Sequence, residues 1–67
     1  MNDNTPTIKP VFYTPDEVAA LLRTTVGRLR SWRHEGGGPV YAKVGIRVMY
    51  PIAEVEKFIA AITVSRD

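Results

Sequence analysis

Apolar residues recur at helical spacing in three segments of this 67-residue chain. Residues three or four positions apart lie on one side of a helix, and an apolar stripe of this kind faces a core. The pattern predicts helices at residues 15–23, 25–35 and 51–62. Their expected inner faces are Val18, Leu21 and Leu22 in the first helix, Val26, Leu29 and Trp32 in the second, and Val55, Phe58, Ile59 and Ile62 in the third.

The first two helices have clear boundary signals. Residues 14–17, TPDE, combine an N-cap hydroxyl, a proline at the first helical position and a glutamate at the capping-box position. Thr25 can accept a hydrogen bond from the free amides of the second helix, and Gly36 can adopt the left-handed conformation that closes it. Because at most Arg23 and Thr24 lie between the two helices, we expect the helices to cross at a large angle, as in a helix-turn-helix.

The segment between the second and third helices predicts a β-hairpin. Residues 36–39, GGGP, cannot continue a helix and form a turn. Residues 40–44 and 48–50 have the pattern of two short strands around Gly45. The expected fold is therefore α+β: a winged helix-turn-helix of three short helices, with a two-stranded β-hairpin wing between the second and third helices.

The register of this hairpin depends on the length of its turn. A two-residue turn at positions 45–46 would place charged Lys43 opposite Val48, within the apolar face. We therefore expect a three-residue tip at 45–47, from which Arg47 projects. In that register Val44 lies opposite Val48 and Ala42 opposite Tyr50, while Tyr41, Lys43 and Met49 face outward.

The chain is short enough to form only one domain. A single core below about 70–80 residues supplies a few kcal/mol of stability. Residues 1–10 are polar, contain two prolines and show no periodicity. We expect a disordered N-terminal arm at 1–10, the winged helix-turn-helix domain at 11–62 and a frayed C-terminal tail at 63–67.

Positive charge is concentrated in the middle of the chain. Six of the nine Lys and Arg residues lie at positions 23–47, where Glu35 is the single acidic residue, so this segment carries +5. The flanking segments 1–22 and 48–67 carry −2 and −1, which gives the net charge of +2. A basic patch of this kind is typical of nucleic-acid binding.

Several other classes of function are not expected. The chain has no cysteine and a single histidine, His34, so we expect no metal site and no cofactor. No nucleophile–base pair is visible, and we expect the protein not to be an enzyme. The sequence has neither a membrane-length apolar run nor the pattern of a signal peptide. We therefore expect a cytoplasmic location, in a bacterial cell or a phage-infected host, and no membrane partner.

The second helix is predicted to be a DNA recognition helix. Its face opposite the apolar stripe carries small, polar or positively charged residues, which a major groove can admit. These are Gly27, Arg30, Ser31 and His34, with Arg28 and Glu35 at the margin.

Four successive segments resemble one known family: TPDEVAALL, TVGRLRSWRHEG, YAKVGIRVMY and PIAEVEKFI. Together they are similar to the excisionase group of small winged helix-turn-helix proteins, which is related to MerR-type DNA-binding domains. The resemblance covers residues 13–62. Its most specific features are Trp32 near the end of the second helix, Gly45 at the hairpin tip and Tyr50 before the last helix.

The resemblance implies a phage or mobile-element excisionase, also called a recombination directionality factor. Such a protein binds tandem sites near an attachment site, bends the DNA and directs an integrase towards excision. The implied partners are double-stranded DNA, an integrase and further copies of the same protein on neighbouring sites. Two alternatives stay open: a small MerR-like transcriptional regulator, and a basic protein-interaction adaptor.

The family's base-facing positions fall at Gly27, Arg30 and Ser31, and its minor-groove wing contact falls near Arg47. Because Gly27 and Ser31 replace longer polar side chains, we expect sparse base readout from this helix. Arg33 lies near the apolar edge, where it either covers the core or reaches a phosphate. Trp32 is assigned to the core. The full set of DNA-binding candidates is Thr25, Gly27, Arg28, Arg30, Ser31, Arg33, His34, Lys43 and Arg47.

Overall fold

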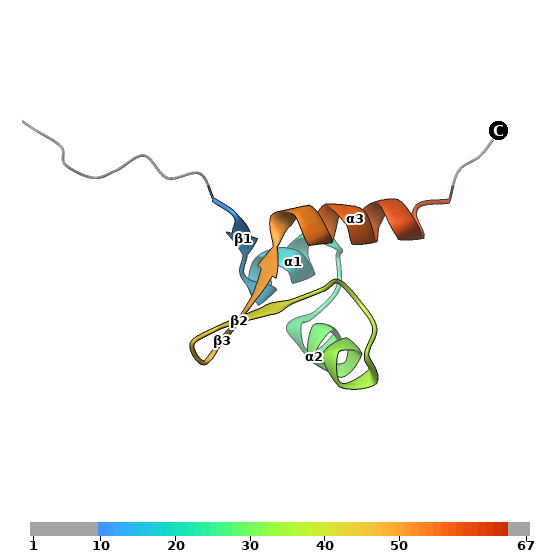
Figure 1. Ribbon diagram of the computed structural model, residues 1–67. Helices are drawn as coiled ribbons and strands as arrows, with labels where there is room; N and C mark the ends of the chain where they lie inside the picture. Colours follow the sequence, from blue (N-terminus) through green and yellow to red (C-terminus); the bar gives the residue numbers. More distant parts are fainter. Residues whose placement is uncertain (1–9, 65–67) are drawn as a thin grey trace, which may run out of the picture.

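The computed structural model describes residues 10–64, which form three helices and a three-stranded antiparallel sheet (Figure 1). The order of the strands in the sheet is β1-β3-β2. This arrangement confirms the predicted α+β winged helix-turn-helix. The elements along the chain are β1 (Phe12–Tyr13), α1 (Pro15–Leu21), α2 (Val26–Glu35), β2 (Ala42–Val44), β3 (Arg47–Pro51) and α3 (Ile52–Ile62).

The predicted arm at 1–10 and tail at 63–67 lie outside the described residues, apart from Pro10, Thr63 and Val64. Within the part of the chain that is described, no helix has the length and apolar character that crossing a membrane requires.

The predicted helix caps are present. Thr14 Oγ1 accepts a hydrogen bond from the Glu17 amide at 3.2 Å, and Glu17 Oε1 accepts one from the Thr14 amide at 2.8 Å, which completes a capping box. Thr25 Oγ1 accepts from the Arg28 amide at 3.0 Å. Gly36 closes α2 with a left-handed φ of 83°. Each of these N-caps contributes about 1 kcal/mol, so both helices are stabilised where the sequence places their starts.

Helix α1 ends two residues earlier than predicted, at Leu21. Arg23 adopts a left-handed φ of 57°, and its amide donates to the Ala20 carbonyl at 3.2 Å. The amide of Thr24 then donates to the Ala19 carbonyl at 2.8 Å. The backbone around Arg23 thus closes the helix, at a conformational cost of about 1–2 kcal/mol for a residue other than glycine.

The predicted hairpin register is wrong. Strands β2 and β3 are joined by a two-residue turn, Gly45-Ile46, and the cross-strand pairs are Ala42 with Met49, Lys43 with Val48 and Val44 with Arg47. Gly45 has a φ of 63°, whereas Ile46 does not have a positive φ. This is the pattern of a type II′ turn, which requires glycine at its first central position and suits the twist of a two-residue hairpin.

The change of register reverses the two faces of β2, whereas Val48 and Tyr50 of β3 keep the predicted inner face. Val48 packs against the core, so its partner Lys43 also lies on the inner face of the sheet, towards α2. Val44 and Arg47 lie on the outer face, where the Val44 side chain is 49% exposed. We expected no charged residue on the inner face. That prediction is wrong because the inner face extends beyond the core, where Lys43 lies.

Strand β1 is an addition to the predicted two-stranded wing. Phe12 pairs with Pro51 and Tyr13 with Tyr50, so β1 extends the sheet along the free edge of β3. The Ile52 amide also donates to the Val11 carbonyl at 2.9 Å. The segment before α1 is thereby fastened to the base of the wing.

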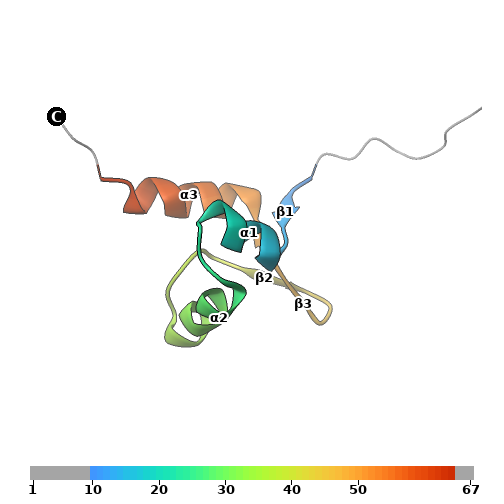
Figure 2. The same ribbon diagram turned by 180° about the vertical axis from the view of Figure 1, so that it is seen from behind.

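The core lies where the helices meet the inner face of β3. Its buried residues are Val18 and Ala19 of α1, Leu29 of α2, Tyr50 of β3 and Val55 of α3. Val26 and Trp32 of α2 pack against this cluster, which confirms the predicted stripe. Leu21 and Ile62 were predicted to face the core, but they are 45% and 57% exposed. For Ile62 the reason is visible in Figures 1 and 2, where the C-terminal half of α3 extends beyond α1.

Trp32 packs against two segments of the chain. Its ring centroid lies 5.9 Å from that of Phe58 on α3, and Gly38 also lies close to its side chain. A Cβ atom at Gly38 would lie 2.8 Å from Trp32 Cε3, and the φ of Gly38 is 77°. Both space and backbone conformation therefore require glycine at this position.

We predict that Gly38→Ala lowers the free energy of unfolding by about 1–3 kcal/mol, because the new methyl group overlaps Trp32 and the left-handed backbone becomes strained. Urea denaturation measures this change. Gly37→Ala is the matched control, since a Cβ there meets no atom within 4 Å and Gly37 has no positive φ. Equal effects of the two substitutions would contradict the packing described for Trp32.

Candidate nucleic-acid interface

Helix α2 and the free end of the β2–β3 hairpin lie on the same side of the molecule, opposite α3 (Figures 1 and 2). The core fixes this arrangement, because Leu29 buries the inner side of α2 and Tyr50 and Val48 hold the inner face of β3. The remaining sides of both elements are open to solvent. They form one continuous candidate surface.

The outer face of α2 is exposed as predicted. Gly27, Arg28, Arg30, Ser31 and His34 are all exposed, and so is Glu35 at the C-terminal end. A Cβ atom at Gly27 would have only Thr25 Oγ1 within 4 Å, at 3.9 Å, so packing within the protein does not require glycine there. The first turn of α2 therefore presents an unobstructed backbone to a partner.

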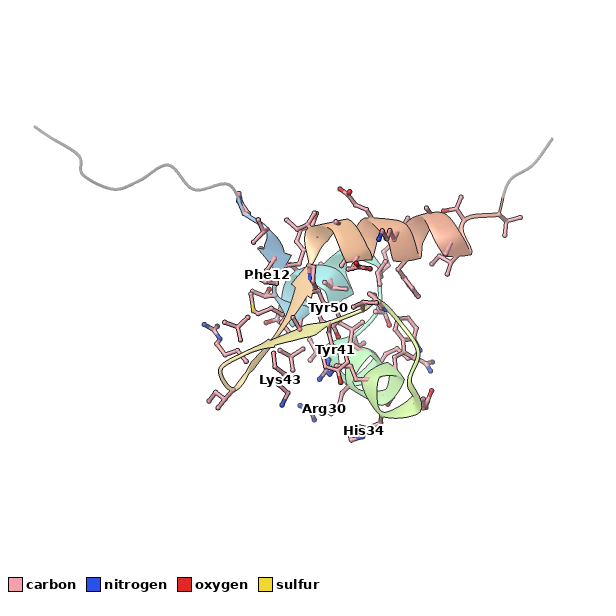
Figure 3. The ribbon with its side chains drawn as sticks, viewed as in Figure 1. Phe12, Arg30, His34, Tyr41, Lys43 and Tyr50 are labelled. Carbon is pink, nitrogen blue, oxygen red and sulfur yellow. The ribbon has the colours of Figure 1, made fainter. Side chains whose placement is uncertain are left out.

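A groove of about 260 Å³ separates α2 from the inner face of the wing. Three basic residues of α2 and one of the wing line it, and no acidic side chain does. Figure 3 shows Lys43, Arg30 and His34 along the lower edge of the molecule, with Tyr41 above them. The lining residues are Arg30, Arg33 and His34 from α2 and Tyr41, Lys43 and Val48 from the wing.

Arg33 joins the two walls of the groove. Its Nη1 atom donates a hydrogen bond of 2.7 Å to the hydroxyl of buried Tyr50, and its guanidinium carbon lies 5.6 Å from the ring centroid of Tyr41. A cation over an aromatic face is attractive, by about 0.5–2 kcal/mol. The two aromatic rings themselves lie 6.3 Å apart. Arg33 is therefore held at the floor of the groove with its charge partly exposed to it.

The structure brings some predicted site residues together and separates others. Lys43, predicted to face outward, lines the groove with Arg30 and His34. Arg47, predicted at the hairpin tip, is instead the first residue of β3 and lies on the outer face of the wing. Thr25 is engaged in capping α2 through its hydroxyl.

Tyr41 is the residue that sequence reasoning missed, because the three-residue turn placed it outside. The Gly-Ile dipeptide at the turn indicates the correct register, because glycine in the first position of a two-residue loop is typical of a type II′ hairpin. That register brings Tyr41 and Lys43 to the face of Val48.

A short helix after a tight turn, a wing that follows it and a basic surface across both define the helix-turn-helix class of domains. The sequence profile of a helix-turn-helix domain family matches residues 12–63. The chain belongs to this family, and membership of the family indicates that its partner is DNA. No match to a curated protein or to a solved structure was found.

We predict that Arg30→Ala and Lys43→Ala each lower the magnitude of the slope of log Kd against log salt concentration by about 0.9, because each removes one phosphate-neutralising charge. Titration of a labelled duplex at several salt concentrations measures the slope. Lys57→Ala is the matched control: it removes the same charge from α3, on the opposite side, where Lys57 pairs with Glu54 at 3.7 Å. A loss of slope in Lys57→Ala equal to that in Arg30→Ala would contradict the assigned surface.

Proposed function

We propose that this protein is a sequence-specific DNA-binding excisionase. In this proposal it binds tandem sites near a phage or mobile-element attachment site, bends the DNA and directs an integrase towards excision. It acts in the cytoplasm of a bacterial cell or phage-infected host, and it performs no catalysis itself. The observation that supports DNA binding most directly is the basic surface shared by α2 and the wing, opposite α3.

Helix α2 is the element proposed to enter the major groove. A helix with its side chains is about 10–12 Å across, and the major groove of B-DNA is about 12 Å wide. The exposed face of α2 carries short side chains at Gly27 and Ser31, which allow its backbone to approach the bases closely. Arg30 is then the one long side chain at the base-facing positions, and a guanine edge is the partner that suits a guanidinium.

The wing is proposed to contact the adjacent backbone and minor groove. Lys43 lies on the side of the hairpin that faces α2, where a phosphate between the two grooves would be within its reach. Arg47 lies on the other face of the same hairpin. The two basic residues therefore approach the DNA from opposite sides of the wing, instead of both projecting towards α2.

Arg33 has a different role in this proposal. Because it donates to the hydroxyl of Tyr50 and lies over Tyr41, it holds the wing beside α2 and adds charge to the floor of the groove. Of the two alternatives for this residue, covering the core or reaching a phosphate, its hydrogen bond to buried Tyr50 favours the first. The residues proposed to contact DNA directly are Arg28, Arg30, Ser31, His34, Lys43 and Arg47. Thr25 and Gly27 are proposed to lie where the backbone of α2 comes close to the DNA.

Tandem binding follows from the small number of contacts. A module with four to six cationic contacts loses affinity steeply as salt is raised, since each neutralised phosphate contributes about 0.9 to the slope. In this proposal, neighbouring copies contact one another, so a bound copy holds the next at a high effective concentration beside its own site and overcomes this weakness. The excisionase assignment itself rests on the resemblance of residues 13–62 to that group.

We expect cooperative binding to DNA from an attachment site with several sites and weaker binding to a duplex with one site, because neighbouring copies support each other. Gel-shift titration of both duplexes measures this difference. An in vitro recombination assay with the cognate integrase should then show excision only when the protein is present.

A palindromic footprint at an operator, with no effect on recombination, would contradict the excisionase proposal and favour a transcriptional regulator. Absence of DNA binding at physiological salt would contradict DNA binding altogether and favour a protein-interaction adaptor. Double substitution of Arg30 and Lys43 by alanine is the matched negative control for both assays.

A further inference from the structure

The tip of the wing carries an unusual side chain. Ile46 is 95% exposed, the highest exposure among the large hydrophobic residues of the described segment 10–64. Burial of an isoleucine side chain contributes about 1.5–3 kcal/mol to the stability of a fold, and this contribution is absent at position 46. Turn positions usually carry Gly, Pro, Asn, Asp or Ser. Nothing in the fold of the isolated chain accounts for an isoleucine here.

The turn presents this side chain alone. Gly45 precedes it with a φ of 63°, and a Cβ atom at Gly45 would meet nothing within 4 Å. Glycine is therefore required there by backbone conformation and contributes no side chain to the tip. The end of the hairpin is consequently a narrow two-residue turn with a single apolar side chain.

Two positive charges lie just behind this tip. Lys43 is on the inner face of the hairpin, opposite Val48, and Arg47 is on the outer face, opposite Val44. The tip lies on the same side of the molecule as the exposed face of α2 (Figures 1 and 2). An apolar tip flanked by a cation on each face matches the minor groove, which has bases at its floor and a line of phosphates along each wall.

We infer that Ile46 is a wedge that inserts between two stacked base pairs from the minor groove and kinks the DNA. Apolar side chains, isoleucine among them, act in this way in proteins that bend DNA by about 20–90°. Unstacking a base step costs a few kcal/mol, and the closer contact of Lys43 and Arg47 with the phosphates offsets this cost. The inference rests on the proposed DNA binding and locates the bend within one copy of the protein.

The test uses the full chain and a short duplex with a single site, selected from random DNA by binding to the protein. Fluorophores at the two ends report the bend by energy transfer, and 2-aminopurine at successive positions reports unstacking. The variants are Ile46→Ala, Ile46→Leu and Val44→Ala. Val44→Ala is the matched control, because it shortens another exposed aliphatic side chain of the same hairpin.

We expect the wild-type protein and the Ile46→Leu and Val44→Ala variants to bend the duplex and to raise the fluorescence at one base step. Ile46→Ala should lose both signals while its affinity falls by less than about tenfold, or 1.4 kcal/mol, because the unstacking cost disappears with the wedge. Its thermal midpoint should stay unchanged, since the side chain makes no contact with the core.

An unchanged bend in Ile46→Ala, or a wild-type protein that binds one site without bending it, would overturn the wedge and leave DNA binding intact. A wild-type protein that binds no duplex would overturn both proposals. An equal loss of bending in Val44→Ala would show that the apolar character of the whole hairpin, not the tip residue, is responsible.

Discussion

The hydroxyl of buried Tyr50 couples the wing to α2. The residue is 1% exposed, and a phenol in that position requires a hydrogen-bond partner, which Arg33 of α2 supplies at 2.7 Å. The backbone of Tyr50 also pairs with that of Tyr13, so the first and third strands are tied together at the same point. Separating the wing from α2 would leave this hydroxyl unpaired, at a cost of about 1–3 kcal/mol. The relative position of α2 and the wing is therefore set before any partner binds.

Acidic and basic residues lie on different parts of the molecule. Two acidic residues near the chain start, Asp16 and Glu17, lie in the first turn of α1, where the helix dipole favours them. On α3, Glu54 pairs with Lys57. Of the basic residues of the middle segment, Arg30, Arg33 and Lys43 line the groove where α2 and the wing meet. Glu35, at the C-terminal end of α2, is the single acidic residue of that segment. An electrostatic field of this kind attracts a polyanion to one face of the molecule.

Local signals predicted most of the fold, and longer-range contacts account for the errors. Caps at Thr14 and Thr25 depend on atoms three residues apart, so the sequence displays them directly. The predicted hairpin register was wrong because it required the inner face of the wing to be apolar core along its whole length. That face leaves the core beyond Val48 and becomes the wall of a groove. The contact of Arg33 with Tyr50 spans 17 positions and has no local sequence signature. The exposed face of α2 was predicted correctly because it is simply the reverse of the apolar stripe.

If DNA binds the side of the molecule formed by α2 and the wing, amide chemical shifts should report it. In NMR spectra of isotope-labelled protein titrated with a duplex, we expect the largest shift changes at residues 25–35 and at the hairpin residues 43–47, with little change along α3. Shift changes concentrated on residues 54–61 of α3, with α2 unaffected, would show that DNA binds elsewhere.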